Sequence, residues 1–178
     1  MSDLIDLKLF IFDVDGVLTD GSLYYGPEGE QVKCFNVKDG VAFKLWPELG
    51  AQVAVISAKQ SPMLVKRLTD LRVVHQALGC ADKVSAADLI RQQLGLQWQQ
   101  VAFVGDDCID LPLLRLVGAS VCPSDAHEYV RSQVDMVMPV AGGKGVARLL
   151  LDLWLKALGK YPQAYERATQ ASFERAQP

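Results

Sequence analysis

The stretch FIFDVDGVLTDG, residues 10–21, ends an apolar segment with Asp13 and Asp15 and continues with Gly16 and a further acid, Asp20. Two unpaired carboxylates about 4 Å apart repel each other by roughly 4 kcal/mol at an effective dielectric of 20. A cluster of this kind usually has a bound cation to offset the repulsion. The stretch therefore points to a cation site directly after a buried strand.

The composition is that of a globular domain. The chain has 178 residues, of which 50% are hydrophobic and 22% are charged, enough for one domain with its own core. The net charge of -3 gives no general attraction to nucleic acid or to anionic membranes. No apolar run approaches the ~20 residues that a membrane span needs. We therefore expect neither a nucleic-acid nor a membrane partner, and any anion must bind at a local site.

The four cysteines form no C-x-x-C pair, so neither a zinc site nor a dithiol redox motif is indicated. They are Cys34, Cys80, Cys108 and Cys122. We expect separate buried thiols in the reducing cytoplasm, and the start of the chain lacks the pattern of a signal peptide. His75 and His127 have no other plausible ligands beside them and are interpreted as structural or surface residues.

Apolar segments of strand length alternate with segments of helical character along the chain. We expect strands at residues 7–12, 51–57, 72–78, 100–105, 119–123 and 135–139. We expect helices at about 39–50, 62–71, 83–94, 111–118, 126–133 and 146–158. The helix that begins after Asp82 is expected to bury one apolar face, formed by Val84, Ala87, Leu89 and Leu94.

This alternation predicts an α/β, Rossmann-like fold, a parallel sheet with helices on both faces. Residues 22–37 are typical of a β-hairpin insertion, and no segment between the motifs is long enough for a separate cap domain. We expect one domain over residues 1–160 and a polar C-terminal tail over 161–178, most such tails being disordered.

In parallel α/β sheets, ligands bind beyond the carboxyl ends of the strands. The polar residues that follow the first four expected strands are Asp13 and Asp15, then Ser57, then Lys83, then Asp106, Asp107 and Asp110. Five carboxylates, a hydroxyl and an ammonium would thus meet at one edge. Each alone has a simpler interpretation, such as a solvated turn or an exposed lysine, but their order makes coincidence improbable.

The set suits phosphoryl transfer through an aspartyl intermediate, with Asp13 as the nucleophile. Asp15 would protonate the departing alkoxide and later deprotonate water. Mg²⁺ prefers oxygen ligands and only one or two carboxylates, which we expect from Asp13 and Asp106, with the Asp15 carbonyl as a further ligand. The Gly after D-V-D stands too early for a calcium loop.

The remaining residues of the set would support the reaction. Ser57 would hydrogen-bond a phosphoryl oxygen, and Lys83 would offset the charge shared by Asp13 and the phosphoryl group. Asp107 and Asp110 are expected to orient the metal's waters and Lys83 instead of binding metal directly.

These motifs resemble those of the haloacid dehalogenase superfamily of phosphohydrolases. Residues 13–17 are similar to its first motif, Ser57 to its second, Lys83 to its third, and residues 105–110 to its fourth. Two rival classes remain. A receiver-type signalling module also uses Mg²⁺ and an aspartyl phosphate, but has its two adjacent acids after the first strand. In this chain the adjacent acids, Asp106 and Asp107, follow the fourth expected strand. A non-catalytic assembly domain is opposed by the complete catalytic set.

Within that superfamily, DVDGVLTDG, FNVKDG, GDDCIDLP and GGKG resemble the phosphatases of 3-deoxy-D-manno-octulosonate 8-phosphate. The likeness runs from about residue 7 to 160. It implies Mg²⁺-dependent hydrolysis of a small sugar-acid phosphate in the cytoplasm, for lipopolysaccharide synthesis. It also implies a capless homotetramer in which the hairpin, and in some members the C-terminal segment, helps cover a neighbouring site. From the residues alone, the apolar hairpin side chains suit packing on their own sheet equally well.

Two departures from that family concern the substrate. The second motif continues with Ala58 and Lys59 where the family usually has Gly-Arg, and Asn36 stands where the family tends to have histidine. A lysine keeps the charge but lacks the fork that suits a carboxylate. A nonulosonate 9-phosphate therefore stays an alternative substrate.

The substrate acid is expected to meet two groups. One is Lys59, and the other is the loop 141–145, in which Gly142 and Gly143 expose N–H groups and Lys144 adds charge. An ordinary strand-to-helix turn is the alternative interpretation of that loop.

Overall fold

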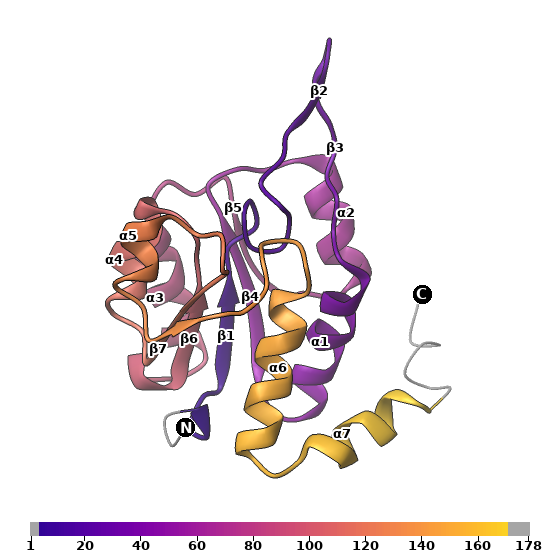
Figure 1. Ribbon diagram of the computed structural model, residues 1–178, viewed down its shortest axis with the longest axis vertical. Helices are drawn as coiled ribbons and strands as arrows, with labels where there is room; N and C mark the ends of the chain where they lie inside the picture. The colour runs from indigo at the N-terminus through magenta and orange to yellow at the C-terminus, as the bar shows by residue number, and fades with distance from the viewer. Residues whose placement is uncertain (1–3, 171–178) are drawn as a thin grey trace.

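The computed structural model describes residues 4–170. Its main sheet has six parallel strands (Figure 1). They are β1 (Leu9–Phe12), β4 (Gln52–Ser57), β5 (His75–Leu78), β6 (Val101–Val104), β7 (Ala119–Cys122) and β8 (Met136–Val137). Each lies inside a predicted strand segment, which confirms the predicted α/β class and its parallel sheet.

The order of the strands across the sheet is β5-β4-β1-β6-β7-β8. Counted along the chain within this sheet, the order is 3-2-1-4-5-6, which is the doubly wound Rossmann order. Receiver modules have the order 2-1-3-4-5, so the topology excludes that rival class. The direction of winding reverses between β1 and β6, and the crevice beyond such a switch point is where these sheets bind ligands.

Helices cover both faces of the sheet. One layer holds α1 (Val37–Glu48), α2 (Pro62–Asp70), α6 (Val146–Ala157) and α7 (Tyr161–Ala168), and the other holds α3 (Lys83–Gln93), α4 (Leu111–Leu114) and α5 (Glu128–Arg131). Because strand side chains alternate, Phe10 and Phe12 pack into the first layer, whereas Leu9 and Ile11 pack into the second. Two short 3-10 turns, η2 (Trp98–Gln100) and η3 (Cys108–Asp110), flank β6.

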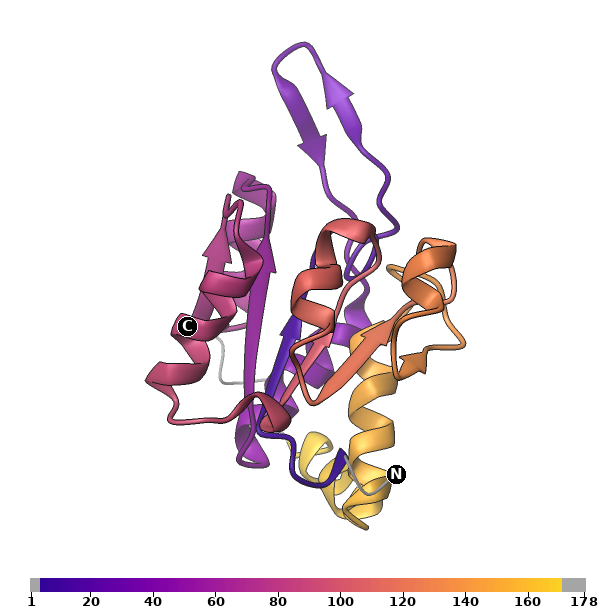
Figure 2. The same cartoon turned by 90° about the vertical axis from the view of Figure 1, so that its left-hand side faces the viewer.

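The hairpin of β2 (Tyr24–Gly26) and β3 (Gly29–Val32) extends away from the body of the domain (Figures 1 and 2). Tyr25 is 68% exposed and Val32 53% exposed, so packing on the molecule's own sheet is the wrong interpretation for these side chains. Phe35 at the hairpin base does pack on the core. The hairpin and α1 fill the segment between β1 and β4, which leaves that segment no room for a cap domain.

Three local expectations differ from the structure. Helix α1 begins at Val37, two residues early, because the Asn36 side chain caps it by accepting from the Lys38 N–H. Helix α7 forms where no element was predicted and packs on α1 and α6. Buried thiols were expected, but Cys34 and Cys108 are exposed.

The division into a domain of residues 1–160 and a tail of 161–178 stays a prediction, and residues 171–178 lie outside the described residues. Helix α7 forms the first part of that predicted tail and lies at the end of the molecule opposite the hairpin (Figure 1).

Candidate active site

The carboxyl ends of β1 and β6 bring the first acids together. The Asp13 N–H donates to the Val104 carbonyl across these strands at 2.9 Å, so Asp13 and Asp106 leave the sheet side by side. Carboxylate oxygens of Asp13, Asp106 and Asp110 all lie within 4.8 Å of one another. We call these three acids the carboxylate cluster. It lies at the topological switch point, beyond the carboxyl ends of β1 and β6.

Lys83 is the cation that contacts this cluster. It is the first residue of α3, whose start is fixed by Asp82, because that side chain accepts from the Ser85 N–H at 3.0 Å. The Lys83 Nζ lies 2.9 Å from Oδ1 of Asp13 and 2.6 Å from Oδ1 of Asp110. Burial alone lowers the pKa of Lys83, but these two carboxylates outweigh it and raise the pKa, so Lys83 stays protonated.

Asp110 is completely buried and its oxygens are used by the protein itself. Oδ1 accepts from Lys83, and Oδ2 accepts from the Asp106 N–H at 3.0 Å. Asp110 therefore fixes both the ammonium and the loop that carries Asp106. The role of Asp110 as an orienting residue instead of a metal ligand stays a prediction.

The charges of the cluster are poorly compensated by the protein alone. Burial raises the pKa of Asp13 to about 6, against the lowering effect of Lys83 and with a further raise from Asp110. Burial raises the pKa of Asp106 to about 7, with further raises from Asp13 and Asp110. A divalent cation bound between Asp13 and Asp106 would offset this repulsion, so the residues fit Mg²⁺.

The Asp15 carboxylate is not one of the three whose oxygens form the carboxylate cluster. Its Oδ1 accepts from the Nζ of Lys33, which comes from the hairpin. The predicted metal contact of Asp15 is through its backbone carbonyl, and that contact stays a prediction. The two acids are thus held by cations from different elements, Asp13 by Lys83 of α3 and Asp15 by Lys33 after β3.

Ser57 ends β4 and is buried, and its Oγ accepts from the Lys59 N–H at 3.2 Å. The Lys59 side chain itself is exposed. Asp107 is also exposed, and its carboxylate accepts from the adjacent Cys108 N–H at 2.6 Å, capping η3. The structure thus places Ser57 and Lys59 at the carboxyl edge of the sheet, and gives Asp107 a local capping contact.

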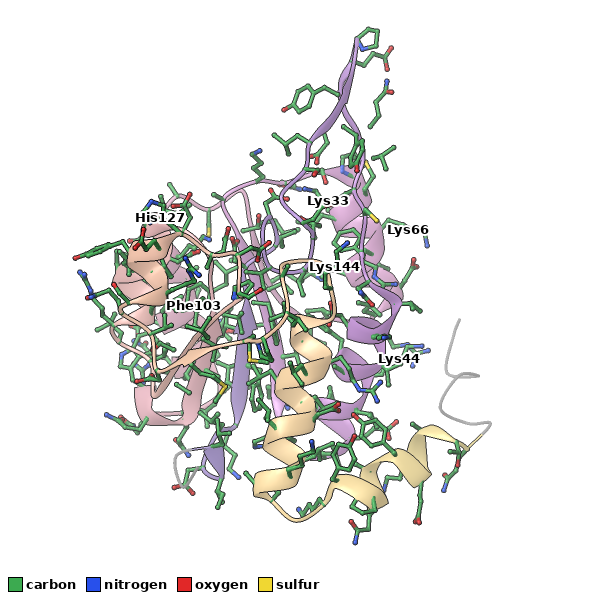
Figure 3. All side chains as sticks on the ribbon, viewed as in Figure 1. Lys33, Lys44, Lys66, Phe103, His127 and Lys144 are labelled. Atoms are coloured by element: carbon green, nitrogen blue, oxygen red, sulfur yellow. The ribbon has the colours of Figure 1, made fainter. Side chains whose placement is uncertain are left out.

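The glycine loop, residues 141–145, packs directly on the loop after β1, residues 13–20, which carries the proposed catalytic acids and which we call the catalytic loop. A Cβ on Gly142 would come within 2.0 Å of the Gly16 carbonyl oxygen, so only glycine fits there. The Gly143 N–H donates to the Val17 carbonyl at 3.0 Å, and the exposed Lys144 follows (Figure 3). The predicted substrate loop is therefore brought beside the predicted nucleophile's loop.

Sequence reasoning missed residues that hold these loops. The Gly142 N–H donates to Asp125 Oδ1 at 2.8 Å, and Asn36 Nδ2 donates to the Gly143 carbonyl at 3.1 Å. Asp125 follows the end of β7, so the strand-end rule that selected Asp13 had a signal for it. Lys33, an ordinary-looking hairpin residue, offered no such signal.

Known proteins resemble this chain closely. Residues 78–150 match the family model for haloacid dehalogenase-like hydrolases. The 3-deoxy-D-manno-octulosonate 8-phosphate phosphatase KdsC of Haemophilus influenzae is 42% identical over 155 residues, covering 87% of this chain and 86% of the relative. The chain belongs to the KdsC family. The KdsC of Escherichia coli K12 is 38% identical over 159 residues, covering 89% and 85%.

Solved structures of KdsC proteins share the fold. The cobalt-bound form from Haemophilus influenzae is 40% identical with a TM-score of 0.89, covering 92% of this chain and 99% of that one. The Moraxella catarrhalis KDO 8-phosphate phosphatase, in complex with magnesium, phosphate and KDO, is 32% identical with a TM-score of 0.88, covering 94% and 96%. No helix within residues 4–170 is long and apolar enough to cross a membrane.

Proposed function

We propose that this chain hydrolyses 3-deoxy-D-manno-octulosonate 8-phosphate to the free sugar acid and inorganic phosphate. The observation that carries the proposal is the carboxylate cluster with Lys83 at the switch point of a chain that belongs to the KdsC family. The Moraxella catarrhalis relative with bound magnesium, phosphate and KDO supports the substrate assignment.

In the first step, a carboxylate oxygen of Asp13 attacks phosphorus. The bond between phosphorus and the sugar oxygen breaks, and Asp15 gives its proton to the departing alkoxide. The free sugar acid leaves, and Asp13 carries the phosphoryl group. The ion pair with Lys83 holds Asp13 in place for the attack.

In the second step, water attacks the phosphorus of the aspartyl phosphate while Asp15 takes a proton from it. The bond between phosphorus and Asp13 breaks, inorganic phosphate forms, and both acids return to their starting states. Ser57 donates a hydrogen bond to a phosphoryl oxygen, and Lys83 offsets the charge at Asp13.

Mg²⁺ would be held by Asp13, Asp106 and the Asp15 carbonyl, and it supplies positive charge next to the phosphoryl group. Asp110 keeps Lys83 and the Asp106 backbone in position, as its contacts indicate. Asp107 would orient water at the cation site, because it lies exposed beside Asp106.

The sugar acid is recognised at the rim, in our proposal by Lys59 and by the loop residues Gly142, Gly143 and Lys144. Lys59 and Lys144 both have exposed side chains, which suits a carboxylate that arrives from solvent.

We further propose a cytoplasmic homotetramer. The exposed hairpin residues Tyr24, Tyr25 and Val32 offer apolar surface for another subunit, and lie on the segment that extends furthest from the body. Light scattering should give a tetrameric mass for the wild type and a smaller mass for Tyr25→Ser with Val32→Ser. An unchanged monomeric mass for both would contradict the assembly.

We propose the C-terminal tail, residues 161–178, as a candidate flap over a neighbouring site, and its last part, residues 171–178, lies outside the described residues. Because α7 packs on the domain, a truncation that tests the flap should end after Gln170 and leave α7 intact. We expect altered turnover with unchanged thermal stability, and unchanged turnover would contradict the flap.

The experiment that tests the function is phosphate release from a panel of phosphorylated sugars and sugar acids, with Mg²⁺ and with chelator. The panel includes the eight-carbon acid and a nonulosonate 9-phosphate, since Lys59 replaces the usual arginine. We expect Mg²⁺-dependent preference for the eight-carbon acid. Preference for the nine-carbon acid would reassign the substrate. If the folded protein released no phosphate from any ester, the chain would instead be interpreted as a non-catalytic assembly domain.

A further inference from the structure

A lysine from the hairpin reaches back to the catalytic loop. Lys33 follows β3 and lies near the base of the hairpin (Figure 3). Its Nζ forms an ion pair with Asp15 Oδ1 and lies 3.0 Å from Oε1 of Glu30. The Lys33 side chain is only 2% exposed, although the strands before it are largely solvated. A buried ammonium at the foot of an exposed hairpin needs an explanation.

Stability of the hairpin does not supply one. Taking a lysine out of water costs several kcal/mol unless acids compensate it, and an apolar side chain would fill the same space without that cost. The compensating acids here are Glu30 and Asp15, and the proposed mechanism needs Asp15 to exchange a proton. The buried ion pair of Lys33 is therefore made with a residue of the proposed active site.

Lys33 is also poorly placed to bind substrate itself. Its Nζ already faces the carboxylates of Asp15 and Glu30 and has almost no exposed surface. Lys83 differs, because it contacts Asp13 and Asp110 inside the carboxylate cluster. Lys83 thus pairs with the first acid of the D-V-D sequence, Asp13, and Lys33 pairs with the second, Asp15.

We propose that Lys33 is a positioning residue that fixes the carboxyl group of Asp15 at the departing oxygen, and so couples hairpin placement to proton transfer. This inference rests on the proposed function, since it assigns Asp15 as the acid and base. A proton donor that is already held in the reactive orientation does not have to lose conformational entropy to reach that orientation at each turnover.

The first test compares Lys33→Met with Lys33→Arg. Lys66→Met is the control, because Lys66 is an exposed lysine that pairs with Asp70 on its own helix. General acid–base catalysis contributes ~10²- to 10⁴-fold, so we expect Lys33→Met to lower kcat on the sugar-acid phosphate by about 10- to 100-fold. KM should change less than about threefold, since binding contacts stay. Lys33→Arg should recover part of kcat, and Lys66→Met should match the wild type.

The second test uses p-nitrophenyl phosphate, whose leaving group departs without a proton. Formation of the aspartyl phosphate then needs no acid, but its hydrolysis still needs Asp15 as base. Lys33→Met should therefore release a rapid burst of p-nitrophenolate, near one equivalent per site, followed by slow turnover. A general loss of structure would remove the burst as well.

The third test is a double-mutant cycle with Asp15→Asn. If Lys33 acts only through Asp15, adding Lys33→Met to Asp15→Asn should lower single-turnover rates no further. A further fall of the same size as in the wild type would overturn the proposal, because it would show that Lys33 acts on the substrate. Unchanged kcat in Lys33→Met would overturn it too. A wild type inactive on every ester would instead contradict the proposed function.

Discussion

The ammonium of Lys83 lies 2.6 Å from Oδ1 of Asp110, a carboxylate with no exposed surface, and 2.9 Å from Oδ1 of Asp13. One cation thus bridges a structural acid and the proposed nucleophile. Because Asp110 also accepts from the Asp106 N–H, a single buried contact connects α3, the end of β1 and the loop after β6.

Lys83→Met should therefore lower stability as well as activity. Removing one partner of a buried ion pair costs about 3–5 kcal/mol, because it leaves Asp110 charged and unpaired. The measurement is urea unfolding at neutral pH, with the surface variant Lys66→Met expected within about 0.5 kcal/mol of the wild type. Equal stability of Lys83→Met and wild type would show that Asp110 does not depend on this lysine.

Asp13→Asn should abolish turnover and keep the fold. Loss of a nucleophile lowers kcat by roughly 10³-fold or more, and an amide cannot form the aspartyl phosphate. The checks are phosphate release and the absence of a phosphorylated intermediate after rapid quenching. Since burial raises the pKa of the native carboxyl, the variant's thermal midpoint without metal should not fall below that of the wild type. A clearly lower midpoint would contradict this account.

Asp106→Asn and Asp110→Asn should differ although both remove a charge from the carboxylate cluster. Asp106→Asn should suppress the thermal shift that Mg²⁺ gives, because it removes a proposed ligand. Asp110→Asn should lower stability without metal, because it weakens the Lys83 pair and the Asp106 N–H contact. Differential scanning fluorimetry with and without Mg²⁺ separates them, with Asp70→Asn as the surface control. Identical behaviour of the two variants would refute this division of roles.

Gly142→Ala should disturb the site through the backbone. Its Cβ would sit 2.0 Å from the Gly16 carbonyl oxygen, so one of the two loops must move, at a cost of about 1–3 kcal/mol. We expect lower stability and lower kcat/KM. Gly26→Ala is the matched control, since its Cβ would meet only the flexible end of Gln31. Equal effects of the two substitutions would count against the close packing of the loops.

Asp39 should make stability depend on pH. Its Oδ1 accepts from the Arg148 N–H at 2.9 Å, its Oδ2 is buried without a hydrogen-bond partner among the described residues, and burial raises its pKa to about 6. Between pH 3.8, the ordinary pKa of an aspartate, and about pH 6, the folded protein holds a proton that the unfolded chain has released. Stability contributed by this group therefore falls as pH rises through that window.

Asp39→Asn should cancel this dependence. The variant should match the wild type near pH 4 and be more stable by about 1–3 kcal/mol near pH 8. Urea unfolding at both pH values gives the difference directly. A difference that stays constant with pH would show that Asp39 is not the group that titrates.

The strands, and the positions of the proposed catalytic residues near strand ends, could be predicted because both are local signals. Each core strand is an apolar run, and each proposed catalytic residue stands at the end of such a run or within a few positions after it. The cap residues Asp82 and Ser61 likewise act within their own helix starts.

Helix α3 shows where the apolar pattern fails. Leu89 was expected inward but is 59% exposed, whereas Ile90 is buried. The buried face runs through Lys83, Ala87 and Ile90, because the contacts of Lys83 with the active-site acids set the rotation of the helix. A hydrophobic pattern treats a lysine as a solvent-facing residue, so it chose the neighbouring face.

The contacts that hold the loops join residues far apart in the chain. Asn36 and Gly143 are separated by 107 positions, and Asp125 and Gly142 by 17. The side chains of Asn36 and Asp125 do not indicate which backbone groups they bind, because Asn and Asp are common at turns and helix caps. Such pairings depend on the folded arrangement and lie beyond reading a single sequence.

The carboxylate cluster has a consequence for protein engineering. The acids that perform the proposed chemistry are also among the groups that burial penalises, as the raised pKa values of Asp13 and Asp106 show. A library screened for heat resistance alone would enrich substitutions at these two positions and so collect inactive proteins. Selection for robustness in this chain must therefore be coupled to selection for turnover.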